Sequence, residues 1–188
     1  TLQTFVKSCD VIVHIAAMNR HEDQQVIYNT NVDLVKKLVK ACEASNSQPK
    51  IIFSSSTQEE KDNLYGKSKR DGRQLIEAWA KLNKASVASL IIQNVFGPFG
   101  KPFYNSFIAT FSHQIVQGEQ PTVINDSTVN LIYINELSNV FYKEIIKQGT
   151  KEIESFVVPH TSSRKVSEIL GLLKEFKTQY IENGQVPK

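Results

Sequence analysis

Short apolar runs alternate along this chain with longer stretches in which apolar residues recur every three or four positions. The runs predict strands, and their continuous apolar character is typical of a sheet covered on both faces. The periodic stretches predict amphipathic helices. The expected strands are 11–15, 50–53, 87–92, 131–134 and 156–158, and the expected helices are 27–42, 65–82, 103–116, 136–146 and 166–176. This alternation predicts an α/β fold, with a parallel sheet flanked by helices and right-handed crossovers.

Composition narrows the class of protein without identifying a function. Of the 188 residues, 40% are apolar and 22% are charged, which is ordinary for a globular domain. The net charge of +3 is too small to indicate nucleic-acid binding, and no run of about 18 apolar residues predicts a membrane span. Cys9 and Cys42 are the chain's two cysteines, and no Cys/His cluster has metal-ligand spacing. A reducing, cytoplasmic setting without a metal site is therefore expected.

The candidate chemistry lies at Tyr65 and Lys69, on a predicted helix that follows a strand and the hydroxyl cluster 54–57. Residues four apart share a helix face, with Cβ atoms roughly 5–6 Å apart. An ammonium there would stabilise the phenolate and lower the pKa of Tyr65 from its usual value of about 10. A serine at the end of the strand could hold a substrate oxygen opposite. The pattern predicts an acid–base site for proton transfer beside hydride transfer; the alternative is a solvated helix start with serines that cap a turn.

Five motifs in sequence order resemble the extended short-chain dehydrogenase/reductase family of nucleotide-sugar epimerases, dehydratases and reductases. They are Asp10–Ala17, Asn29–Val32, Ser54–Ser56, the Tyr65/Lys69 pair and Asn94–Pro98. The short Ser-Ser-Ser-Thr-Gln to Tyr-Gly-Lys-Ser-Lys spacing is similar to the capsular-polysaccharide reductases of UDP-N-acetyl-L-fucosamine synthesis. The resemblance implies a partial Rossmann-like cofactor domain and reduction of a 4-keto-6-deoxy UDP-sugar with NADPH rather than NADH. It also implies a homodimer.

The resemblance assigns three kinds of site residue. The catalytic group is Ser56, Tyr65 and Lys69, with Ser55 and Thr57 left as alternatives for the hydroxyl. The cofactor would be bound by Ala16, Ala17, Asn31, Ser54, Tyr65, Lys69 and Val95. The UDP-linked deoxysugar would be bound by Arg20, Asn94, Asn105 and Ser106.

The resemblance also predicts the organisation of the chain. Residues 1–98 would be the later portion of the cofactor domain, 99–180 a substrate-capping part interleaved with the last strands, and 181–188 a tail or linker. The glycine-rich turn that binds a dinucleotide pyrophosphate is absent from the sequence, which predicts a fragment without that turn or a C-terminal cupin. Two other functions stay open. One is a 4-epimerase or 4,6-dehydratase, for which Glu59 and Glu60 are candidate acids, and the other is a non-catalytic binding module.

Overall fold

The computed structural model describes residues 1–147 and 152–186. The chain divides into two compact units. The first contains Thr1–Gln93 and Ser138–Val158, and the second contains Asn94–Leu137 and Pro159–Lys188. The predicted α/β class with a parallel sheet and flanking helices is confirmed.

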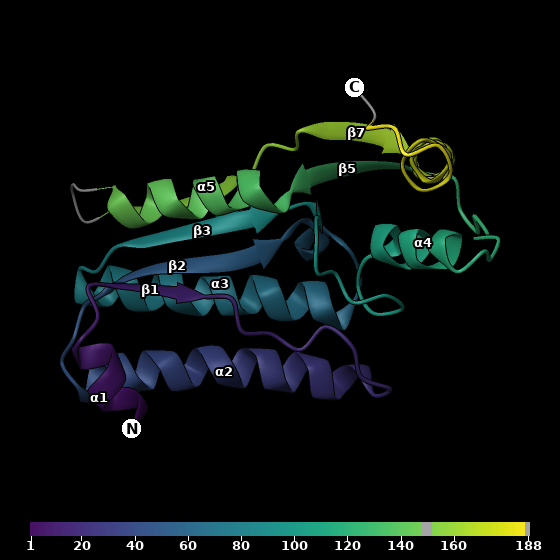
Figure 1. Cartoon of the computed structure of the whole chain (residues 1–188). Coiled ribbons are helices and arrows are strands. Elements are labelled where there is room, and N and C mark those ends of the chain that lie inside the picture. Colours follow the sequence, from purple (N-terminus) through teal and green to yellow (C-terminus); the bar gives the residue numbers. More distant parts are fainter. Residues whose placement is uncertain (148–151, 187–188) are drawn as a thin grey trace. The chain divides into compact units, whose positions relative to one another are not determined.

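The first unit is built on four parallel strands in the order β1-β2-β3-β6. These strands are β1 (Val11–His14), β2 (Lys50–Ser56), β3 (Val87–Ile92) and β6 (Ile153–Val157). Helices α1 (Leu2–Lys7), α2 (Gln24–Ala44) and α3 (Leu64–Asn83) belong to the same unit. Figure 1 shows α2 and α3 running alongside β1, β2 and β3, whose arrows point the same way. Parallel strands end at one edge of a sheet, so the residues that follow β1 and β2 lie at a common edge.

The core of this unit lies between the sheet and helices α2 and α3. Ile51 and Phe53 are alternate residues of β2, and they are buried in one cluster with Val35 and Ile76 from the two helices. Side chains alternate between the faces of a strand, so Lys50 points to the opposite face. There its ammonium pairs with Glu144 of α5 (Ile134–Ile146), with the nitrogen 3.2 Å from a carboxylate oxygen.

The second unit contains a three-strand sheet in the order β4-β5-β7. Its strands are β4 (Asn94–Phe96), β5 (Thr128–Tyr133) and β7 (Ser162–Lys165); β4 runs parallel to β5, and β7 runs antiparallel to it. Helices α4 (Phe107–Val116) and α6 (Val166–Phe176) follow β4 and β7, and the π-helical turn η2 (Lys177–Glu182) continues from α6.

Several element boundaries differ from the sequence prediction. Helix α4 begins at Phe107 and not at Phe103, because Ser106 caps it and Phe103 has a left-handed backbone (φ +56°) that a helix cannot include. The last strand of the first sheet is Ile153–Val157, earlier than the predicted 156–158. The short elements α1, β4 and β7 were not predicted, because runs of three to six residues give little periodicity. Within the predicted tail, 181–182 belong to η2, while 187–188 lie outside the described residues.

Candidate functional site

Tyr65 occupies the first turn of α3, at the edge where β1 and β2 end. The helix begins at Leu64 because Asn63 has an extended backbone and its side-chain oxygen accepts a hydrogen bond from the amide of Gly66 (2.7 Å). The chain enters this helix from β2 through a 3-10 turn, η1 (Thr57–Glu60). The hydroxyl cluster, the Tyr65 helix turn and the loop after β1 therefore share one edge of the sheet.

Gly66 brings η1 into direct contact with α3. A Cβ atom at Gly66 would lie 1.9 Å from the carbonyl oxygen of Gln58 and 2.7 Å from its carbonyl carbon. Glycine is thus required for the backbone of η1 to reach the helix beside Tyr65. This contact fixes the turn that leads away from Ser56 against the helix that carries Tyr65 and Lys69.

The neighbouring serines of β2 have different environments. Ser55 is buried, and its hydroxyl donates a short hydrogen bond to the carboxylate of Glu59. Ser56 lies on the opposite face of the strand and is half-buried. Its oxygen accepts a hydrogen bond from the amide of Gln58 (3.2 Å), so it caps η1 and keeps its own proton for another acceptor. Of the two, Ser56 is the hydroxyl that can still donate to a ligand.

Lys69 is 3% exposed, one helical turn after Tyr65. Its ammonium nitrogen lies 5.0 Å from the centre of the Phe53 ring, and it forms no hydrogen bond or ion pair with any described residue. Burial lowers the pKa of Lys69 to about 8, an effect that the negative charge of Glu59 partly offsets. A buried ammonium is costly without acceptors. The site is therefore suited to a ligand that offers hydroxyl or other oxygen acceptors.

The predicted lowering of the pKa of Tyr65 is wrong for this structure. Burial raises the pKa of this half-buried phenol, and no opposing effect of Lys69 is present. The physical reason is that the low-dielectric surroundings disfavour the phenolate, while the Lys69 ammonium lies over the Phe53 ring. Tyr65 is consequently protonated at neutral pH, which is the form that donates a proton.

Replacing Lys69 by Met should stabilise the fold most near neutral pH, because the variant buries no charge. The pKa of Lys69 is about 8 in the folded chain against 10.5 as the ordinary value, so the unfolded chain binds more protons between these values. The wild type therefore gains stability as pH rises through that window. The difference in the free energy of unfolding between Lys69→Met and the wild type should therefore shrink by roughly 3 kcal/mol from about pH 7 to about pH 10.5. Urea unfolding of both proteins at the two pH values measures this change. Replacement of the exposed Lys67 by Met is the control. A stability difference between Lys69→Met and the wild type that does not depend on pH would contradict the prediction.

Asn31, a predicted cofactor ligand, is buried and engaged by the protein itself. Its side-chain oxygen accepts from the amide of Met18 (2.6 Å), and its nitrogen donates to the Met18 carbonyl and to the Ser68 hydroxyl (both 3.0 Å). Both amide protons are therefore used. These contacts tie the loop after β1 to α2 and α3. A cofactor contact by Asn31 stays a prediction, and it would use the second lone pair of the side-chain oxygen.

The other predicted residues of the first unit lie at the same edge. Ala16 is exposed and Ala17 half-buried on the loop after β1, where small side chains leave the backbone open to a ligand. Ser54 is half-buried on β2, and Arg20 is exposed on the loop before α2.

The predicted residues of the second unit lie on β4 and immediately before α4. Asn94 and Val95 lie on β4, where the Asn94 amide donates to the carbonyl of Asn130 on β5 (3.1 Å). Asn105 is exposed just before α4. The oxygen of Ser106 accepts from the amide of Ala109 (3.2 Å), so Ser106 is the N-cap of that helix.

Sequence reasoning missed the buried ion pair between Glu59 and Arg73. Arg73 donates from Nε to both carboxylate oxygens of Glu59 (3.1 Å each) and from Nη2 to one of them (2.8 Å). The two residues are 14 positions apart on different elements, so no periodic pattern connects them. Glu59 is one of the two candidate dehydratase acids, but Arg73 and Ser55 occupy its carboxylate.

Two features are absent from the part of the chain that the structure describes. No group of three or more His, Cys, Asp or Glu side chains there is arranged to hold a metal ion. Within residues 1–147 and 152–186, no helix combines the length and the apolar content needed to cross a membrane.

The amino-acid sequence of this chain is similar to known proteins. The model of the NAD dependent epimerase/dehydratase family matches residues 1–154. A UDP-2-acetamido-2,6-beta-L-arabino-hexul-4-ose reductase from Pseudomonas aeruginosa is 30% identical over 178 residues, which are 94% of this chain and 47% of the relative. This chain therefore spans about half the length of that reductase.

Solved structures show the same fold. The capsular polysaccharide assembling protein CapF from Staphylococcus aureus matches with a TM-score of 0.81 and 31% identity, over 96% of this chain and 49% of that one. A UDP-glucuronic acid 4-epimerase from Bacillus cereus, in complex with NAD, matches with a TM-score of 0.83 and 18% identity, over 94% of this chain and 61% of that one. At that identity, the epimerase shows a shared fold alone.

Proposed function

Because this chain belongs to the NAD-dependent epimerase/dehydratase family, we propose that the protein is an NAD(P)H-dependent reductase of a 4-keto-6-deoxy UDP-sugar. The observation that carries the proposal is the pair formed by protonated Tyr65 and buried Lys69, whose ammonium has no acceptor among the described residues. The reductase from Pseudomonas aeruginosa supports the substrate class, and the capsular polysaccharide assembling protein from Staphylococcus aureus supports a role in making precursors of a surface polysaccharide.

The residues of this chain fit the nicotinamide end of the cofactor. When bound, the nicotinamide supplies a hydride to the carbonyl carbon of the sugar. Lys69 would donate hydrogen bonds to the ribose hydroxyls, which would satisfy its buried ammonium. The small side chains of Ala16 and Ala17 would let the cofactor approach the loop after β1, and Ser54 would line the same edge.

Tyr65 and Ser56 would act on the oxygen of the sugar carbonyl. The Ser56 hydroxyl would donate a hydrogen bond to this oxygen as negative charge develops on it. The Tyr65 hydroxyl would then give its proton to the forming alkoxide, and the product would leave with a new C–H and a new O–H bond. Water would then return a proton to Tyr65 and restore the starting form of the site. A donor preorganised at developing charge is typically worth about 10²–10³ in rate.

The finer assignments belong to the same proposal. Arg20, Asn94, Asn105 and Ser106 would bind the UDP-sugar, and Val95 would contact the cofactor. Residues 1–98 would serve the cofactor, residues 99–180 would cap the substrate, and 181–188 would be a tail or linker. We further infer NADPH rather than NADH, a homodimer and a cytoplasmic location. A dehydratase is disfavoured, because Arg73 and Ser55 hold the Glu59 carboxylate.

Steady-state assays of the full-length protein test this function. With a 4-keto-6-deoxy UDP-sugar, the absorbance of NADPH should fall in step with product formation, because each hydride reduces one carbonyl. NADH should support a slower reaction. Redox-neutral conversion of a UDP-hexose without ketosugar reduction would replace the proposal with a 4-epimerase or dehydratase. Absence of both activities, with normal folding, would indicate a binding module.

A further inference from the structure

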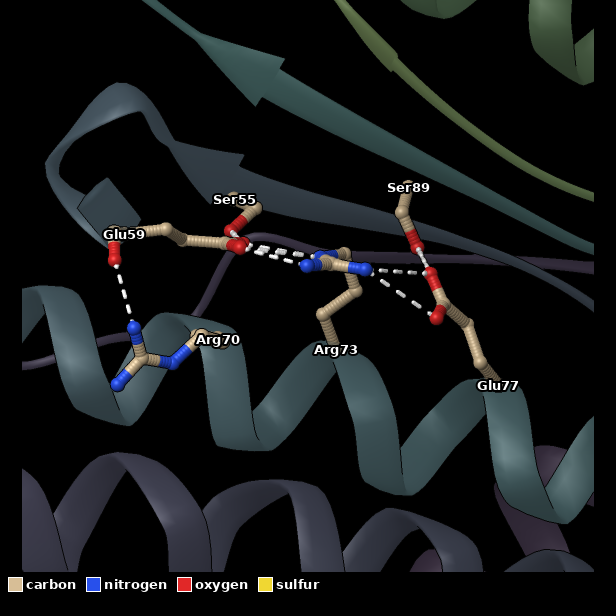
Figure 2. Close-up of polar contacts among 6 residues, drawn as sticks. All are labelled: Ser55, Glu59, Arg70, Arg73, Glu77 and Ser89. Carbon is tan, nitrogen blue, oxygen red and sulfur yellow. Dashed lines mark hydrogen bonds and ion pairs between the residues drawn. The ribbon is translucent and has the colours of Figure 1, made fainter.

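A chain of polar contacts crosses the buried side of the first unit, from β2 through α3 to β3. Figure 2 shows the Arg73 guanidinium between the carboxylates of Glu59 and Glu77. Arg73 Nη1 lies 3.3 Å from both carboxylate oxygens of Glu77, which in turn accepts a hydrogen bond from Ser89 (3.0 Å). Ser55 closes the other end by donating to Glu59.

Glu59 is the most enclosed charge in this network. The residue is 6% exposed, and its carboxylate receives donors from Arg73 and Ser55. Its backbone carbonyl accepts a further hydrogen bond from Arg70 Nη1 (3.1 Å). Both the backbone and the side chain of Glu59 are thus bonded to α3. A buried ion pair is tolerated when its polar atoms have hydrogen-bond partners, and each side-chain nitrogen of Arg73 and each carboxylate oxygen of Glu59 has one here.

The position of Glu59 links this network to the proposed reaction. Glu59 is the third residue of the turn η1. Ser56 caps this turn, and the turn packs on Gly66. Anchoring Glu59 to α3 therefore fixes the distance between the Ser56 turn and the helix turn that carries Tyr65. Loss of the anchor would free η1 to move relative to both residues.

Arg73 follows Lys69 by one turn of α3, so the Glu59 carboxylate that it holds lies on the helix face that carries Lys69. The negative charge of Glu59 partly offsets the lowering of the pKa of Lys69 by burial. The other groups around Lys69 are the Phe53 ring on β2, the half-buried His14 at the end of β1, and Tyr65 on its own helix. None of these three is an anion at neutral pH.

We propose that Glu59, held by Arg73, is a positioning residue of the reductase site that fixes the Ser56 turn on α3 and supplies the negative charge facing Lys69. This inference rests on the proposed function for its catalytic meaning. Its electrostatic part concerns the chain by itself and can be measured without cofactor or substrate.

The first test is NMR titration of the Lys69 εCH₂ group in the full chain without cofactor. Glu59→Gln should lower the titration midpoint of Lys69 by about one pH unit, because an opposing charge is removed. Glu77→Gln is the matched control: it takes a carboxylate from the same guanidinium but should leave the Lys69 midpoint unchanged. Local loosening would expose Lys69 and raise its midpoint, so the expected fall cannot come from a damaged fold. An unchanged or raised midpoint in Glu59→Gln overturns the electrostatic part.

The second test uses Arg73→Lys, which keeps the charge but cannot make the forked contact with Glu59. The Lys69 midpoint should stay near the wild-type value, while kcat of the full-length protein should fall about tenfold to a hundredfold with little change in KM for the sugar. If kcat of Arg73→Lys equals the wild-type value, the proposed positioning role of Glu59 is overturned. This outcome is decisive even if Glu59→Gln does not fold. If the wild type does not reduce the ketosugar while the titrations behave as expected, the proposed function fails and the charge assignment stands.

Discussion

Tyr65→Phe should lower kcat for reduction of the 4-keto UDP-sugar by about 10²- to 10³-fold. The variant loses the one hydroxyl that the proposal places beside the forming alkoxide, while the ring that packs at the start of α3 is kept. Burial raises the pKa of Tyr65, so the wild-type phenol carries its proton at neutral pH and is ready to donate it. Steady-state kinetics with NADPH in the full-length protein measures the loss.

Tyr28→Phe is the matched control for this experiment. This variant also loses a phenolic hydroxyl, and the hydroxyl of Tyr28 donates to Asp71 (2.7 Å) on α3, a residue to which the proposal assigns no part in the reaction. Its removal should cost about 1 kcal/mol of stability and leave kcat near the wild-type value. Near-normal ketosugar reduction by Tyr65→Phe, with circular dichroism like the wild type, would refute the assigned role of Tyr65.

Gly66→Ala should destabilise the first unit by about 3 kcal/mol or more, although alanine is the better helix former. The new methyl group would lie 1.9 Å from the carbonyl oxygen of Gln58, a backbone atom that cannot rotate away as a side chain would. The turn η1 must therefore move, and the Ser56 turn moves with it. Ketosugar reduction should be lost together with stability.

Gly171→Ala provides the opposite expectation within the same chain. Gly171 also lies inside a helix, α6, but an added Cβ meets no atom within 4 Å. This variant should gain about 0.5–1 kcal/mol, because alanine loses less backbone entropy in a helix. Urea unfolding of both variants gives the comparison. If Gly66→Ala were as stable as the wild type, η1 would not pack on α3 at this residue.

Much of the first unit could be predicted from the sequence, because its signals are local. The apolar runs at 50–53 and 87–92 and the periodic stretch at 65–82 correspond to β2, β3 and α3. The strand β4 could not be predicted, since a single residue, Gln93, separates it from β3 and the apolar pattern does not mark the change of sheet.

The candidate site was predictable in its residue types but not in its electrostatics. The spacing of Tyr65 and Lys69 placed them one turn apart, yet spacing does not show how deeply each group is buried. Burial decides the direction of both pKa values. The contact between Glu59 and Arg73 depends on how η1 packs on α3, and a sequence pattern within either element does not contain that information.

Successive side chains of β2 point to opposite faces of the sheet, so its two final serines have different roles. Ser55 points inward and joins the buried ionic network, whereas Ser56 faces away from it. The direction of the side chains repeats every two residues of a strand. Inserting or deleting one residue here would therefore turn each following serine to the opposite face, although the segment would remain rich in serine. Evolution within this stretch should consequently tolerate changes of side chain more readily than changes of length.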